Sequence, residues 1–147
     1  MAVIQMNTMK ASQVFNGSHG ELWLDGDYMA EATACNAEVN LEKAEIKIVK
    51  RLCKNYKVTG YECKGKIKLN KVSSYMIKKL SDKMKQAKQV SFEIVSYIND
   101  PDAIGAERVV IKDAVFDKLI LVDWEAGKMG EEEYEFTFTD WDILEVA

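Results

Sequence analysis

Residues that carry chemistry are scarce in this chain of 147 residues. Its one histidine, His19, lies in a stretch rich in glycine and serine, where a lone imidazole is usually exposed to solvent. Its three cysteines, Cys35, Cys53 and Cys63, are an odd number without C-x-x-C spacing, which indicates reduced thiols rather than disulfides or a zinc site. These shortages predict no catalytic centre, no metal and no cofactor.

Long hydrophobic runs and phosphate-binding loops are also missing. No stretch of about 18 apolar residues occurs, so we expect no transmembrane helix, and the first residues do not have the pattern of a signal peptide. No glycine-rich loop follows a strand pattern and opens a helix, which argues against nucleotide hydrolysis. With 48% hydrophobic residues, 30% charged residues and one proline, the composition predicts one folded, soluble domain over residues 1–147.

Charge is distributed unevenly along the chain, although the net charge is only −4. Residues 42–88 hold fifteen basic and four acidic residues, a balance of +11, whereas residues 93–147 hold four basic and fifteen acidic residues, a balance of −11. Such polarity indicates a face that binds polyanions, or contacts between complementary subunits, or ordinary solvated faces.

The first strong strand signal lies in residues 20–31, GELWLDGDYMAE, where Asp25-Gly26 predicts a tight turn between two strands. Leu22 and Leu24 share one face of the first strand, while Trp23 lies on the face that should meet water. We interpret the second strand as a long return strand through residues 28–41, with weak alternation and many small residues. The residues before the hairpin, 1–19, predict a flexible lead-in.

Residues 42–65 predict a highly charged strand–loop–strand arm, because Ile46 and Ile48 alternate with charged residues and glycines interrupt the pattern later. One α helix follows at residues 73–86, with an apolar stripe at helical spacing. The members of this stripe, which should cover one sheet, are Met76, Ile77, Leu80 and Met84.

The rest of the chain predicts strands at residues 89–98, 107–116, 117–124 and 131–141. Residues 117–124, DKLILVDW, are too continuously apolar for a strand with one wet face. The last segment alternates most cleanly, with aromatic residues facing one way and Glu133 and Glu135 the other. The predicted fold class is mainly β: an antiparallel β sandwich or barrel with one flanking α helix and a long projecting β arm.

Two functional interpretations follow from the residues alone. A nucleic-acid-binding module would use the basic arm, where Tyr56 and Tyr61 lie among the lysines as stacking platforms. Against this, the pI is about 5.1 and Arg51 is the only arginine in the basic region, although arginine is best suited to bidentate phosphate contacts. The other interpretation is a structural protein that acts without an active site.

Three blocks of sequence favour the structural interpretation. In order, they are GELWLDGDYMAEATACNAEVNLEKAEI, GAERVVIKDAVFD and GEEEYEFTFTDWDIL, and the similarity that they carry runs from about residue 17 to residue 144. Their order and spacing resemble the tail tube proteins of contractile phage tails, especially the PBSX-type tube proteins found in defective prophages and R-type bacteriocins. The tube subunit serves both kinds of particle, so the chain leaves phage and bacteriocin open.

The resemblance implies six-fold rings that stack into a hollow inner tube within a sheath, with baseplate and tail terminator proteins as further partners and DNA only in transit. It implies synthesis in a bacterial cytoplasm and assembly into a virion tail or bacteriocin particle. It also implies roles for apolar and charged residues that would contact neighbouring subunits or the sheath. We expect subunit or ring-stacking contacts at Ile46, Ile48, Val49, Leu52, Tyr56 and Trp23, and sheath contacts at Lys78, Lys79 and Lys83.

A conduit works best when its wall does not retain the cargo, so a channel for a polyanion should be neutral or acidic. We therefore expect a polar, net acidic lumen drawn from the return strand, at Glu31, Thr33 and Glu38. Glu133 and Glu135 are further candidates for the lumen, but they could equally face outward or meet a neighbour's lysines.

Overall fold

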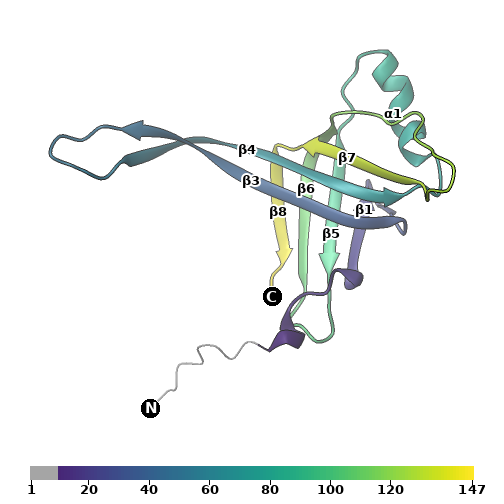
Figure 1. Ribbon diagram of the computed structural model, residues 1–147, viewed down its shortest axis with the longest axis horizontal. Helices are drawn as coiled ribbons and strands as arrows, with labels where there is room; N and C mark the ends of the chain where they lie inside the picture. The colour runs from purple at the N-terminus through teal and green to yellow at the C-terminus, as the bar shows by residue number, and fades with distance from the viewer. Residues whose placement is uncertain (1–9) are drawn as a thin grey trace.

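The computed structural model describes residues 10–147 as two layers of antiparallel β sheet with a helix at one end and a hairpin that extends far beyond them (Figure 1). Two 3₁₀ turns, Ala11–Gln13 and Gly17–His19, precede the first strand. Residues 1–9 of the predicted lead-in lie outside the described part. The elements are β1 Gly20–Leu24, β2 Asp27–Tyr28, β3 Ala32–Ile46, β4 Asn55–Asn70, α1 Tyr75–Lys85, β5 Phe92–Ile98, β6 Glu107–Phe116, β7 Glu131–Thr137 and β8 Asp140–Glu145.

Strand β6 links the two layers. The strand order is β2-β1-β5-β6-β7-β4-β3, and β8 also pairs with β6. The first part of β6, from Glu107 to Lys112, pairs with β5 and β8, whereas Val115 and Phe116 pair with β7. Between these parts Asp113 has a φ of 55°, and the register with β5 shifts. This bulge bends the strand out of one sheet and into the other, as bulges commonly do at sandwich corners.

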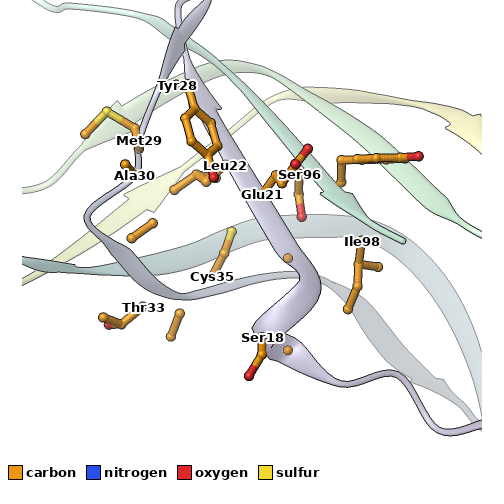
Figure 2. Close-up of a pocket in the computed structure, with 15 residues that line it drawn as sticks. Ser18, Glu21, Leu22, Tyr28, Met29, Ala30, Thr33, Cys35, Ser96 and Ile98 are labelled. Carbon is orange, nitrogen blue, oxygen red and sulfur yellow. The ribbon is translucent and has the colours of Figure 1, made fainter. Parts of the chain in front are cut away.

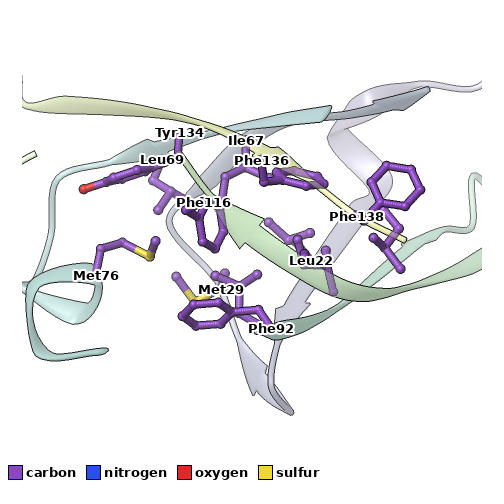
Figure 3. Packing of buried hydrophobic residues seen from close by; sticks show 14 of the residues in the cluster. Leu22, Met29, Ile67, Leu69, Met76, Phe92, Phe116, Tyr134, Phe136 and Phe138 are labelled. Atoms are coloured by element: carbon purple, nitrogen blue, oxygen red, sulfur yellow. The ribbon is translucent and has the colours of Figure 1, made fainter. Parts of the chain in front are cut away.

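The core lies between the layers and is dominated by aromatic residues (Figure 3). Phe92 and Ile94 of β5 are buried on one face, as their alternation predicts. Phe116 packs edge-to-face on Phe92, Tyr134 and Phe136, with ring centroids 5.1 to 5.9 Å apart. Met76 and Leu80 bury one stripe of α1 against this cluster, while Ile77 is half-buried and Met84 is 38% exposed.

The arm is the longest feature of the chain. β3 and β4 pair continuously from Ala32–Leu69 to Ile46–Asn55, with a shift between Glu42 and Lys43. β4 pairs with β7 only over Lys64–Asn70, so beyond this point the hairpin is a two-stranded ribbon without support from a third strand. The predicted arm is thus a β hairpin, and its tip is residues 47–54 (Figure 1).

Two predicted strand boundaries differ from the structure. The return strand of the first hairpin is interrupted at residues 29–31, so β2 pairs with β1 while β3 pairs with β4 in the other sheet. The last predicted strand is two strands, β7 and β8, which pair with different partners. A continuous pattern in the sequence cannot reveal that the chain crosses between layers.

The predicted strand at residues 117–124 is wrong. Residues 117–130 form an irregular loop instead, because β6 turns into the loop after it has paired only two residues with β7. Leu119 and Ile120 pack partly against the core, but the apolar side chains beyond them face solvent. The exposed fractions are 65% for Leu121, 76% for Val122, 83% for Trp124 and 93% for Met129.

Candidate assembly surfaces

The arm carries one apolar face that continues the core-facing side of its sheet. Register pairs place Val39 opposite Cys63 and Leu41 opposite Tyr61, and paired residues share a face. Cys63 is 6% exposed, whereas Val39, Leu41 and Tyr61 are 39%, 55% and 56% exposed. The face is therefore covered where the sandwich ends and uncovered farther out. Only near its base does it find a partner, where the Tyr61 ring lies 5.7 Å from that of Trp141 in β8.

The predicted contact residues of the arm gather near its tip. Ile46 ends β3, Tyr56 is the second residue of β4, and the other three lie in the turn between these strands. Their exposed fractions are 45% for Ile46, 46% for Ile48, 87% for Val49, 104% for Leu52 and 56% for Tyr56. Residues 47–57 also hold five basic residues and no acidic one. The tip thus carries both exposed aliphatic side chains and a cluster of basic residues.

Trp23 does not lie with the arm residues. Its ring contacts Tyr28 of β2 with centroids 5.2 Å apart, on the face of the sheet that is turned away from the core. Register pairs continue this row to Val95 of β5 and Val110 of β6. Trp23, which we expected on the face that meets water, is therefore part of an apolar row that crosses four strands. Sequence reasoning missed the row, because only the strand register reveals it.

The lysines predicted to meet a sheath lie on α1 and are exposed. Lys79 also has partners in its own chain: its Nζ is 3.8 Å from Asp27 Oδ2 and 5.5 Å from the centroid of the Tyr75 ring. The Tyr75 hydroxyl donates to the same carboxylate at 2.8 Å. Burial and the neighbouring Asp27 raise the pKa of Tyr75. This cluster attaches the start of α1 to the first hairpin, and Lys78 and Lys83 take no part in it.

The predicted lumen residues lie at the base of β3. Glu31 precedes the strand and is half-buried, whereas Thr33 and Glu38 are exposed. The Thr33 hydroxyl donates to the carbonyl of Lys68 at 3.3 Å, and Glu38 lies opposite Lys64. These two residues lie on an outer edge of the arm sheet.

Glutamates and lysines alternate across the outer face of that sheet. Glu133 lies opposite Lys68 and Glu135 lies opposite Lys66. Lys66 also approaches Glu133 with a nitrogen-to-oxygen distance of 3.5 Å. The outer face of the arm sheet therefore carries mixed charge rather than a uniformly acidic surface. The pairing of lysines with glutamates depends on the strand register, so it is not visible in the sequence.

A groove of about 540 Å³ opens between β1 and β3 (Figure 2). Strand β1 and the beginning of β3 lie at the side of the sandwich away from the arm (Figure 1). Small residues of β3 and the preceding turn form one wall, including Ala30, Ala32, Ala34 and Cys35. Leu22, which also belongs to the core, lines it from β1. The sequence signal for the groove was the run of small residues in the predicted return strand, because small side chains leave space beside a strand.

A buried carboxylate holds the exposed loop in place. Glu132 is 6% exposed and forms an ion pair with Lys71, whose backbone N–H donates to the carbonyl of Gly130 at 2.8 Å. Burial and Glu132 raise the pKa of the adjacent Tyr134. These contacts anchor the chain where the loop ends and β7 begins.

Within residues 10–147, no three metal-ligating side chains come together, and Cys35, Cys53 and Cys63 are free thiols. No helix in this part of the chain is both long and apolar enough to cross a membrane. The surface features that stand out in the described residues are the apolar face of the arm, its basic tip, the groove, the outer apolar row and the exposed loop.

Comparisons with known proteins identify the family of this chain. A family model described as phage tail tube protein matches residues 7–145. The phage-like element PBSX protein XkdM of Bacillus subtilis (strain 168) is 32% identical over 140 residues, which cover 93% of this chain and 95% of that protein.

Two solved structures show the same fold at low identity. A chain in the tube-terminating cap of the anti-feeding prophage has a TM-score of 0.73 at 9% identity and covers 99% of this chain and 100% of that chain. A chain from the sheath–tube complex of an extracellular contractile injection system in the extended state has a TM-score of 0.66 at 7% identity, covering 95% and 100%. From the family match and the PBSX relative, this chain belongs to the phage tail tube protein family.

Proposed function

We propose that this protein is the structural subunit of the inner tail tube of a contractile injection system, either a phage tail or an R-type bacteriocin. Subunits form six-fold rings, and the rings stack into a hollow conduit inside a sheath. The arm is the observation that carries this proposal. Its apolar face continues from the core into solvent, and the chain belongs to the tail tube family.

An isolated two-stranded ribbon is only marginally stable in water, and an uncovered strand edge is a template for pairing with another chain. Here β3, 15 residues long, is the last strand of its sheet and is exposed along almost its whole length. Closing such edges against neighbouring copies satisfies their backbone groups and covers Val39, Leu41 and Tyr61. Repetition of one heterologous contact then produces a closed ring.

The other proposed partners are suggested by the assemblies that contain the structural neighbours. The structural neighbours include chains in a sheath–tube complex and in a tube-terminating cap. We assign Lys78, Lys79 and Lys83 to the sheath side and Glu31, Thr33 and Glu38 to the lumen. Baseplate and terminator proteins bind the ends of the tube, and DNA passes through only in a phage. Synthesis in the bacterial cytoplasm precedes assembly of the particle.

Electron microscopy of the purified protein tests the proposal. At high protein concentration, negative-stain images should show rings with an axial hole and stacks of these rings. Particles that stay monomeric at every concentration and salt tested would contradict it. A nucleic-acid-binding module would instead remain monomeric and retard single-stranded DNA in a gel through the lysines of the arm and the exposed Tyr56.

A further inference from the structure

Exposed apolar side chains lie at both ends of the sheet that contains β1, β5, β6 and β8. One set, which we call the loop patch, lies in the loop after β6 and consists of Leu121, Val122, Trp124 and Met129. The other set, the terminal patch, comes from the segment before β1, the β5–β6 turn and the residues after β8. Its members and their exposed fractions are Ile104 80%, Val146 73%, Val14 60% and Phe15 37%.

Two contacts bring the three segments of the terminal patch together. The backbone N–H of Asn16 donates to the Asp100 carboxylate at 2.9 Å, which holds the segment before β1 beside the β5–β6 turn. A Cβ built on Gly105 of the same turn would lie 3.2 Å from the Cα of Ala147, so the chain after β8 packs against that turn as well. The terminal patch is therefore one composite surface at one end of the molecule (Figure 1).

Strand β6 separates the two patches. It begins at Glu107, next to the β5–β6 turn, and ends at Phe116, directly before the loop. Its ten residues, at about 3.3 Å each, place roughly 30 Å between the patches, so the two cannot meet within one molecule. The arm leaves the sandwich sideways, whereas β5, β6 and β8 run from one patch to the other (Figure 1). Contacts through the arm and contacts through the patches therefore extend in different directions.

Charge favours a second copy as the partner of each patch. Residues 71–88, which include α1 at the same end as the loop patch, carry six basic residues and one acidic residue. Residues 99–107 in the terminal patch carry three acidic residues and no basic one. Asp100 is engaged by backbone N–H groups, but Asp102 and Glu107 are exposed and form no ion pair within residues 10–147. Opposite charge at the two ends orients one molecule head-to-tail on the next.

The attraction comes from the summed field of each end rather than from one ion pair. Arg108 follows the β5–β6 turn but is paired with Glu145, and Lys10 alone does not outweigh the three acids of the turn. Residues 71–88 stay net positive even when two of their lysines are replaced by glutamate. No single lysine of α1 is therefore required for this contact.

We propose that the loop patch of one subunit packs on the terminal patch of a copy in the next ring, so that these two surfaces form the contact that stacks rings. This inference rests on the proposed function and deepens it, because it separates stacking of rings from the sideways contacts of the arm. A head-to-tail contact between opposite ends of a molecule repeats along a line. Each contact is small, but the copies in one ring bind together, so the stacking of whole rings is strong.

Polar substitutions in either patch should separate ring formation from stacking. Leu121→Ser with Trp124→Ser changes the loop patch, and Ile104→Ser with Val146→Ser changes the terminal patch. All four side chains are exposed, so circular dichroism and thermal unfolding should match those of the wild type. We expect each variant to form rings and to lose tubes in negative-stain images. Leu121→Met with Trp124→Phe keeps the loop patch apolar, and this matched control should form tubes of wild-type length.

Engineered cysteines test whether the two patches meet. Ile104→Cys with Met129→Cys places one thiol in each patch, in a background of Cys35→Ser and Cys53→Ser that leaves only the buried Cys63. A short bismaleimide linker added to tubes should join copies in successive rings and produce a ladder on a denaturing gel. Each single cysteine in the same background should give only monomer, because neither patch faces itself in a head-to-tail contact.

The outcomes separate the two proposals. Tubes of normal length from both serine variants, or tubes of the double-cysteine protein without a ladder, would overturn the assignment of these patches and leave the proposed function intact. Serine variants that fold but form no rings would place the patches within a ring and would also overturn the stacking contact. Wild-type protein that forms neither rings nor tubes under any condition would contradict the proposed function itself.

Discussion

Single residues show where the arm is joined to the sandwich. Gly65 of β4 lies where a side chain has no room: a Cβ built there would be 2.3 Å from the carbonyl oxygen of Asn36 and 2.7 Å from the Phe136 ring. The ring of Phe136 therefore lies directly against the backbone at the base of the arm. Gly60, five residues along the same strand, has only the Glu42 carboxylate nearby, at 3.5 Å.

We predict that Gly65→Ala destabilises the fold by about 1–3 kcal/mol, since an overpacked site must displace backbone or a core ring. Gly60→Ala is the matched control in the same strand and should change the free energy of unfolding by less than about 0.5 kcal/mol. Urea denaturation followed by tryptophan fluorescence measures both. Equal effects of the two substitutions would show that the Phe136 contact does not restrict the position.

Asp100 is the other residue with a structural role of its own. Its buried carboxylate accepts from the backbone N–H of Asn16 and of Asp102, both at 2.9 Å, so it ties the segment before β1 to the β5–β6 turn. These two hydrogen bonds lower the pKa of Asp100 below its usual range. A lowered carboxyl pKa means that the stabilisation is present above the unfolded-state value near ~3.9 and is lost as pH falls through the folded-state value.

We therefore expect Asp100→Asn to lower the unfolding free energy at pH 7. This effect should shrink as the pH falls below the unfolded-state value of about 3.9 and vanish below the lowered folded-state pKa, where the wild-type carboxylate is protonated as well. Asp102→Asn changes the same charge at an exposed side chain and is the control. Thermal unfolding across the pH series measures the difference between the variants. A deficit of Asp100→Asn that stays constant down to acid pH would rule out the carboxylate as its cause.

At the scale of elements, the outer part of the arm and the exposed lysine face of α1 contribute least to the core of the sandwich. The outer part of the arm contacts the rest of the chain mainly through Tyr61 and Trp141, and α1 is held by Met76, Leu80 and the Asp27 cluster. Elements with so few internal contacts are available for contacts with other subunits. The arm tip and the exposed lysines of α1 can therefore be altered with little expected loss of fold stability.

Shortening the arm should separate folding from assembly. Replacement of residues 47–54 by Asn-Gly joins the paired residues Ile46 and Asn55 through a two-residue turn that suits a hairpin. We expect a folded monomer that no longer forms rings, because the apolar tip and most of its positive charge are gone. Sedimentation and negative-stain images give the readout, and normal tubes from this variant would refute a role for the tip.

Reversal of charge on α1 should affect a different partner. Lys78→Glu with Lys83→Glu changes the two lysines that take no part in the Asp27 cluster, so helix docking stays intact. We predict normal tubes with impaired sheath attachment, measured by co-assembly with the sheath protein. Lys85→Glu with Lys88→Glu supplies the same charge change beyond the proposed surface. Full sheathing of the Lys78, Lys83 variant would remove these residues from the sheath contact.

Two long segments of the chain carry opposite net charges. Residues 42–88 carry +11 and residues 93–147 carry −11. Single exposed ion pairs contribute only about 0–1 kcal/mol, but a tube repeats each contact many times. The most basic segment, the arm tip, also projects farthest from the sandwich (Figure 1). The fold thus places the most basic segment of the chain where other molecules can reach it.

Self-association should therefore weaken as sodium chloride is raised from about 0.05 to 0.5 M, because salt screens charges separated by more than a Debye length of ~10 Å at 0.1 M. Light scattering at fixed protein concentration follows the change. The variant with Lys50→Gln and Arg51→Gln should show a smaller dependence on salt than wild type. Association that is indifferent to salt in both proteins would show that the charge polarity serves solvation only.

Much of the local structure could be predicted from the sequence. The Asp25-Gly26 hairpin, the helix at residues 75–85 and the buried faces of β5 and β7 all follow from turn chemistry and from periods of two or 3.6 residues. The arm was also predicted, because charge and alternation persisted through residues 42–65. The family was recognisable from blocks of sequence in order. In each case the signal is contained within one segment of chain.

The tertiary structure alone decided how these segments pair. Periodicity shows which side chains need cover, but not which strand supplies the backbone hydrogen bonds. The apolar run at residues 117–124 therefore became an exposed loop once β6 had turned at Asp113 and left it without a partner. For the same reason the row from Trp23 to Val110 could not be seen in the sequence, and the small residues of the return strand did not show which strand would face them across the groove. Both exist only because strands far apart in the chain lie side by side in a particular register.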